Sequence, residues 1–326
     1  MQLLRTSPIR MAEAAGLSPA TCGLLGLSVC AALCVQGLTG VWIRIPHAQW
    51  LAPSVMLLGV LYLSSGSYSH PRFKAAVTLS AVLMVQLPTT CALAYGVQSF
   101  GLPLRDDLFA STDRVVGFDW LIFQSFMVEM KSMMQVLSWV YDTFFLQLSA
   151  APVILAAVGE MRRADRFVSS FILCVLIMVI VGGLLPAEGA AGLVGADQAH
   201  LLFQGATPLA DLHALRDGTL RLVRLEEIGP VISFPSLHCA VAYLVTAAVW
   251  PLKRARWAVL LLNTVMTVSA VTHGAHYACD CVAGLLAAAA SFHAAGRLGP
   301  WSERRFARMR GAVALPAVPA PTAVVS

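Results

Sequence analysis

Charged residues are scarce in this sequence. Asp, Glu, Lys and Arg together make up 12% of its 326 residues, whereas soluble globular domains contain roughly 25%. Apolar residues make up 58%, and the mean hydropathy is +0.75. This composition argues against a soluble protein and indicates a chain that resides largely in a lipid bilayer.

The sequence also lacks the paired cysteine spacings of a disulfide-bonded extracellular domain. Its cysteines mostly lie within apolar runs, at positions 22, 30, 34, 91, 174, 239, 279 and 281. A cysteine in such surroundings behaves as a small apolar residue. We therefore expect buried thiols rather than disulfides.

Eight apolar runs approach the length of roughly 20 residues that a membrane-spanning helix needs. They lie near residues 19–43, 50–67, 75–97, 138–159, 168–187, 233–252, 255–273 and 277–296. The first run lacks a clear small-residue cleavage site, so we expect a signal anchor rather than a cleaved signal peptide. The predicted fold class is all-α: a polytopic membrane helical bundle of about eight transmembrane helices.

Lysine and arginine are distributed unevenly between the two sides of the predicted membrane. One side holds 15 of the 22 basic residues in short loops and tails: Arg5, Arg10, Arg72, Lys74, Arg162, Arg163, Arg166, Lys253, Arg254, Arg256, Arg297, Arg304, Arg305, Arg308 and Arg310. The positive-inside rule makes this side cytoplasmic, with both termini inside. The same clustering accounts for the net charge of +5, so we expect no nucleic-acid partner.

Two outer segments separate groups of predicted spans. Residues 98–137 combine acids with Trp120 among apolar residues, a mixture typical of a helix in the membrane interface. Within residues 188–232, leucines recur near helical spacing at positions 209, 212, 215, 222 and 225. This second segment leads into the first histidine motif, so we expect it to cover a site there. The alternative for each segment is a simple amphipathic connector.

The first motif is Phe234-Pro235-Ser236-Leu237-His238, at the predicted outer end of a span. Proline and serine commonly begin a helix, and the free N–H groups of a first turn bind anions. Ser236 and Leu237 are therefore candidate phosphate-binding residues. His238 is a candidate acid that protonates a departing oxygen. The alternative is a capped helix start that carries an interfacial histidine.

The second motif places His276 four residues before Asp280, on one face of a helix. A carboxylate that orients an imidazole makes histidine a stronger nucleophile or base. The topology brings both residues to the outer membrane face together with His238, and intramembrane ionisable residues are usually functional. One alternative is a buried structural pair. Another is a zinc site built from His273, His276 and Asp280, or with Cys279.

At these residues the chain resembles the type 2 phosphatidic acid phosphatase superfamily, and more narrowly its inositol phosphorylceramide synthase-like branch. The resemblance rests on Ser233–His238 and on Thr272–Asp280, followed by Val282-Ala283-Gly284. Two further stretches, Asp113–Trp120 and Leu185–Gly189, resemble the family more weakly. The first two predicted spans have no recognisable counterpart in the family. The resemblance implies a helical bundle with a six-helix catalytic core.

The resemblance also implies a two-step phosphoryl transfer. His276 would attack phosphorus while Asp280 stabilises the developing imidazolium, which gives a phosphohistidine or phosphodiester-histidine intermediate. His238 would protonate the leaving group and then activate the acceptor. The family needs neither a metal nor another cofactor for this reaction.

The chain departs from the superfamily in two places. The first superfamily motif, a lysine followed several residues later by Arg-Pro, is absent, and Ser269-Ala270 stands where the third motif usually begins Ser-Arg. The loss of two phosphate-binding cations disfavours a plain acid phosphatase and favours the synthase-like branch. We expect Arg216 first, and then Arg221 or Arg224, to bind phosphate instead. The alternative is that these arginines bind lipid headgroups.

The sequence thus predicts N-terminal transmembrane helices over residues 1–97, a catalytic membrane domain over 98–310 and a disordered tail over 311–326. We expect a multi-pass protein of the bacterial inner membrane with its active site at the extracytoplasmic face. Its substrate would be a lipid-linked phosphate or phosphodiester, and its acceptor water or an alcohol such as inositol. A transporter or channel that uses the same residues as a proton or ion relay is the alternative, and an inactive scaffold is a third.

Overall fold

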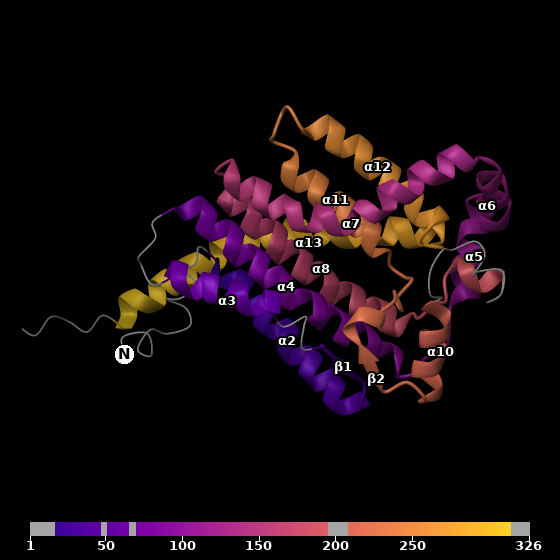
Figure 1. Ribbon diagram of the computed structural model, residues 1–326, viewed down its shortest axis with the longest axis horizontal. Coiled ribbons are helices and arrows are strands. Elements are labelled where there is room, and N and C mark those ends of the chain that lie inside the picture. Colours follow the sequence, from indigo (N-terminus) through magenta and orange to yellow (C-terminus); the bar gives the residue numbers. More distant parts are fainter. Residues whose placement is uncertain (1–16, 47–50, 65–69, 195–207, 314–326) are drawn as a thin grey trace, which may run out of the picture.

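The computed structural model is an elongated bundle of α-helices (Figure 1). It describes residues 17–46, 51–64, 70–194 and 208–313. Within these ranges, regular structure other than helix is limited to two strands of three residues each. The predicted all-α class is therefore confirmed.

The eight predicted spans correspond to eight apolar helices. Five are long and apolar enough to cross a membrane: α2 (Pro19–Thr39), α4 (Pro71–Gln98), α7 (Lys131–Ala157), α8 (Met161–Leu184) and the Ala278–Arg308 part of α13. Three are shorter: α3 (Leu51–Ser64), α11 (Leu237–Val249) and α12 (Arg256–Thr272). The chain is a multi-pass membrane protein.

The N-terminal helices α2 and α4 pack closely against each other. Gly96 of α4 permits this contact, because a Cβ at that position would overlap Cγ1 of Val35 in α2. Further along the same pair, the side-chain amide of Gln86 donates a hydrogen bond to Ser28 Oγ at 3.1 Å. Small residues and interhelical hydrogen bonds of this kind hold membrane helices together, since lipid tails are as apolar as the helices themselves.

Helix α8 lies at the centre of the bundle and supplies much of its core. Phe167, Ile172 and Val175 are almost completely buried, and they belong to one cluster with buried residues of α4, α7, α11 and α13. Alanines such as Ala240 and Ala288 contribute to the same cluster and let neighbouring helices approach closely. From Phe167 to Leu184 α8 carries no charged residue, so this part of the helix is suited to the enclosed position.

The cysteines are free thiols, but the expectation that they are buried holds only for Cys174, Cys239 and Cys281; Cys30 and Cys34 are exposed on the apolar helix α2. All eight are unpaired. Cys174 lies in the central cluster, and Cys239 packs with Cys281 in a smaller one. Side-chain packing, without disulfides, therefore joins the helices.

Short elements gather at one end of the bundle, on the right in Figure 1. They include α5 (Asp106–Val115), α6 (Trp120–Glu129) and α10 (Pro208–Asp217). The leucines at 209, 212 and 215 are buried on α10, as helical spacing predicted. Those at 222 and 225 do not continue the helix, because α10 ends before Gly218 with its positive φ of 86°. There the chain turns into strand β2 (Leu222–Arg224) and the 3-10 turn η4 (Leu225–Glu227).

Strand β2 binds this outer segment to the N-terminal part of the chain. It pairs in parallel with β1 (Trp42–Arg44), with Ile43 opposite Val223. A second link comes from α4, where the Tyr95 hydroxyl donates to Asp211 of α10 at 2.8 Å. The segment that precedes the first histidine motif is therefore held from two sides.

Helix α13 extends further than the sequence predicted. It runs from Ala278 to Val313, so the helix continues past the expected start of the disordered tail at residue 311. The remainder of that tail, residues 314–326, lies outside the described residues. The same is true of residues 1–16, which the topology prediction assigned to the cytoplasm.

Candidate active site

The first motif begins a helix in the predicted manner. Ser236 is fully buried and is the N-cap of α11, where its side chain accepts the Cys239 N–H at 3.5 Å. The Ser236 N–H in turn donates to the Asp280 backbone carbonyl at 3.0 Å. The two motifs, some 40 residues apart in sequence, are thus joined through their backbones.

The start of α11 also packs directly on α13. A Cβ on Gly284 would overlap the carbonyl oxygen of Ser236 and lie 3.1 Å from its carbonyl carbon. Only glycine fits at this contact without movement of one helix. Gly284 therefore fixes the separation between the helix that carries His238 and the helix that carries Asp280.

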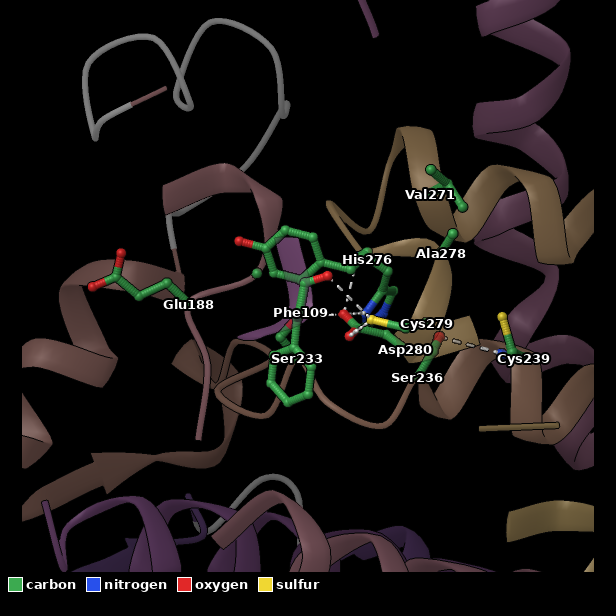
Figure 2. A network of polar contacts seen from close by, with 12 residues as sticks. Phe109, Glu188, Ser233, Ser236, Cys239, Val271, His276, Ala278, Cys279 and Asp280 are labelled. Atoms are coloured by element: carbon green, nitrogen blue, oxygen red, sulfur yellow. Dashed lines mark hydrogen bonds and ion pairs between the residues drawn. The ribbon is translucent and has the colours of Figure 1, made fainter. Parts of the chain in front are cut away.

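His276 and Asp280 form the expected pair (Figure 2), but not on one face of a helix: α13 begins at Ala278, so His276 lies in the loop before it and Asp280 in its first turn. His276 Nδ1 lies 3.3 Å from Asp280 Oδ2, and the same oxygen accepts hydrogen bonds from the Tyr277 N–H at 3.0 Å and from Ser233 Oγ at 3.1 Å. Asp280 is fully buried and His276 is 6% exposed. Because Nδ1 faces the carboxylate, Nε2 is the ring nitrogen left to meet a substrate.

His238 is fixed by aromatic packing. Its ring stacks on Tyr141 of α7 with centroids 4.0 Å apart and an angle of 14° between the planes. Phe144, one helical turn further along α7, lies 4.5 Å away on a tilted plane. These contacts hold the imidazole in one orientation beside the cavity described next.

One cavity brings the predicted catalytic histidines together. Its volume is about 540 Å³, and its lining includes His238, His276 and Ser233. His273 also lines it, and burial lowers the pKa of this half-buried histidine, which favours its neutral form. The cavity wall therefore carries three imidazoles within a mostly apolar surface.

Two carboxylates of α5 hold the start of the second motif. Both oxygens of buried Asp113 accept backbone N–H groups of α13, from Ala278 at 2.7 Å and from Cys279 at 2.9 Å. Asp106 accepts the Tyr277 hydroxyl at 3.2 Å, and burial raises the pKa of the Asp106 carboxyl. Helix α5 thereby caps α13 one residue before Asp280.

The two stretches that resemble the family weakly, Asp113–Trp120 and Leu185–Gly189, have structural roles that could not be inferred from the sequence alone. Trp120 Nε1 donates to the Val271 carbonyl at 3.0 Å, next to the second motif. Gly189 has a φ of 79°, and a Cβ there would lie 2.5 Å from Ser233 Oγ. Together with Asp113, these residues support the segment that carries the His–Asp pair.

The arginines expected to bind phosphate lie away from the cavity lining. Arg216 donates to a backbone carbonyl of the loop before α5 at 2.8 Å. Arg224 is paired with Glu226 and Glu227, and Arg221 is exposed. In the part of the chain that the structure describes, no lysine or arginine lines the cavity. Phosphate binding by these arginines stays a prediction.

The zinc alternative finds no ligand set. Among the described residues there is no group of three or more His, Cys, Asp or Glu side chains arranged to hold a metal ion. His273 Nδ1 instead lies 2.8 Å from the Thr272 hydroxyl, and Cys279 Sγ is directed towards the Phe109 carbonyl at 3.8 Å.

We expect Asp113→Ala to lower both stability and turnover. Loss of a helix cap costs about 0.5–2 kcal/mol, and the released α13 start carries Asp280. Turnover should fall at least about tenfold, since small displacements of reacting groups are costly. The loss should appear in kcat rather than KM, because Asp113 does not line the cavity.

The matched control is Asp107→Ala, which removes an exposed carboxylate from the same helix. Thermal unfolding in detergent and steady-state kinetics would compare the two variants. Equal behaviour of Asp113→Ala and Asp107→Ala would contradict a positioning role for Asp113.

The fold and the site define a class: multi-pass helical membrane proteins with a His–Asp pair and a second histidine on the wall of an internal cavity. The sequence model of the PAP2 superfamily matches residues 107–294, which is more than half of the chain, and the chain belongs to this superfamily. It is accordingly a phosphatase-type or phosphotransferase-type enzyme of lipid phosphates. No significant match was found among curated proteins or among solved structures.

Proposed function

We propose that this protein transfers a phosphoryl or phosphodiester group from a membrane lipid, at the extracytoplasmic face, through a covalent histidine intermediate. The observation that carries the proposal is the pairing of His276 Nδ1 with the buried Asp280 carboxylate on the wall of a cavity that His238 also lines. The side of the membrane rests on the distribution of lysine and arginine.

In the first step, Nε2 of His276 attacks phosphorus and forms a P–N bond as the bond to the leaving oxygen breaks. Asp280 stabilises the positive charge that develops on the imidazole. His238 gives its proton to the leaving oxygen. The N–H groups at the start of α11, with Ser236 as the cap, stabilise the phosphate oxygens.

In the second step, His238 takes a proton from the acceptor hydroxyl. The acceptor oxygen attacks phosphorus, the P–N bond breaks, and His276 returns to its starting form. Water as acceptor makes the enzyme a lipid phosphatase. An alcohol such as inositol makes it a headgroup transferase, in keeping with the synthase-like branch.

One observation favours a phosphodiester over a phosphomonoester substrate. Asp142 and Glu188 line the cavity, and no cationic side chain of the described residues does. A phosphate monoester carries up to two negative charges near neutral pH, whereas a phosphodiester carries one. The two carboxylates therefore repel a bound phosphodiester less than a bound monoester. This favours the transferase form of the reaction.

The test is a panel of lipids offered to purified protein, with His276→Ala alongside. The panel contains phosphatidate, a polyprenyl phosphate, phosphatidylinositol, and ceramide together with phosphatidylinositol. Release of free phosphate that the variant lacks identifies a phosphatase. Movement of a headgroup onto an alcohol without free phosphate identifies a transferase. Absence of both reactions from folded wild-type protein would contradict the proposal and favour a transporter or channel.

A further inference from the structure

The cavity that holds the histidines continues well beyond them into the bundle. Its volume of about 540 Å³ far exceeds the small voids of a packed protein interior and falls within the range of sites for small molecules. Leu87 lines it on α4, and at 1.5 Å per residue this position is about 16 Å from the outer end of that helix. The cavity thus reaches roughly halfway through the hydrocarbon layer.

Polar and apolar residues occupy different ends of this cavity. The histidines and Ser233 lie at the outer end together with the carboxylates Asp142 and Glu188, whereas the lining that α8 contributes is apolar. Phe171, Val175 and Met178 of α8 and Leu148 of α7 line the inner part, and each is at most 6% exposed. A cavity with this polarity matches a molecule that has a phosphate at one end and a hydrocarbon chain at the other.

One inner wall comes from a helix outside the family match. Leu87, Thr90, Cys91 and Ala94 of α4 line the cavity, whereas the superfamily match begins at residue 107. The N-terminal part of the chain therefore contributes to the wall of the cavity and also holds the segment before the first histidine motif. The residues of this wall lie outside both catalytic motifs.

The cavity has an exposed side between α4 and α7. Leu87 is 40% exposed and Phe145 is 59% exposed, yet both belong to the cavity lining. A side chain with both properties lies where the cavity meets the surface, and at this depth the surface faces lipid. A hydrocarbon chain can pass here without crossing water.

We propose that the cavity binds one hydrocarbon chain of the lipid substrate, which enters from the bilayer between Leu87 and Phe145, and that α4 sets the preference for that chain. This inference rests on the proposed function for the identity of the phosphate, but the binding of a chain can be tested separately. The polar end presents the phosphate to His276 while the chain lies against α4, α7 and α8.

The test uses Cys91→Trp, which fills the inner cavity from the α4 side, and Met178→Phe, which alters it from α8. The matched control is Val85→Trp, because Val85 is 44% exposed on α4 and does not line the cavity. Dioleoyl phosphatidate and dibutanoyl phosphatidate serve as probes with the same headgroup. We expect Cys91→Trp to lower the ratio of kcat/KM for the long chain over the short chain at least tenfold relative to Val85→Trp.

An unchanged ratio in both cavity variants would overturn the inference. If wild-type protein turns over neither phosphatidate, lipid retention provides the second readout. Native mass spectrometry of detergent-purified protein, incubated with dioleoyl phosphatidate and dioleoyl phosphatidylinositol, should then detect bound lipid in the wild type and in Val85→Trp but at least tenfold less in Cys91→Trp. Equal retention by all variants would overturn the cavity site, whereas retention without turnover would contradict the proposed function alone.

Discussion

Replacement of His276 by alanine is expected to abolish turnover. The variant loses the nucleophile, and removal of a catalytic nucleophile reduces kcat by up to about 10⁶-fold in other enzymes. Asp280→Ala should cost about 10²–10⁴-fold, because it leaves the histidine but removes the group that orients and charges it. Initial rates on whichever lipid the panel identifies would measure both.

The matched control is His293→Ala, because His293 lies on α13, as Asp280 does, but is exposed and away from the cavity. It should keep wild-type activity. Both catalytic variants should elute from size-exclusion chromatography as the wild type does. Near-normal turnover by His276→Ala would show that another residue is the nucleophile.

A single methyl group at Gly284 is also expected to lower turnover strongly. The added Cβ of Gly284→Ala would overlap the Ser236 carbonyl oxygen, so α11 must move away from α13. His238 moves with α11, whereas Asp280 stays on α13. Displacement of a reacting group by about 1 Å can cost 10²-fold, and we expect a loss of that order in kcat.

Gly299→Ala is the natural comparison, because a Cβ at Gly299, also on α13, would meet nothing within 4 Å. It should leave activity unchanged. Steady-state kinetics and thermal unfolding of the two variants would separate a general effect of glycine removal from the specific contact with Ser236. Equal kinetics would refute the idea that Gly284 sets the spacing of the catalytic groups.

The membrane-spanning architecture could be predicted because its physical cause is local. A run of about 20 apolar residues is sufficient to indicate a span, and all eight predicted ranges contain helices. Helix ends were harder to predict, since α7 begins at Lys131 and α13 continues to Val313.

The His–Asp pair could be predicted for a similar reason. A separation of four residues within a predicted helix led to the expectation that the two side chains meet, and they do, at 3.3 Å. The geometry differs from that expectation, because α13 begins at Ala278 and His276 lies in the loop before it. The capping of α13 by Asp113 could not be predicted, because it joins residues about 165 positions apart. The sequence indicated only that Asp113 belongs to a stretch that weakly resembles the family. It did not indicate which residues Asp113 contacts.

The α4 wall of the cavity illustrates the same limit. Hydropathy identifies α4 as a span, but nothing in Leu87 or Cys91 distinguishes a side chain that faces a cavity from one that faces lipid. That difference depends on how α4 is rotated against α7 and α8. Only the packed bundle determines the rotation.

The parallel pairing of β1 with β2 has a consequence for biogenesis. Strand β1 precedes its partner by about 180 residues, and at synthesis rates of 5–20 residues per second the nascent chain carries β1 for roughly 10–40 seconds before β2 exists. During that interval its backbone N–H and C=O groups form an open edge. The sheet is complete only once β2 has been synthesised, so this link between the N-terminal helices and the segment before the first histidine motif forms late.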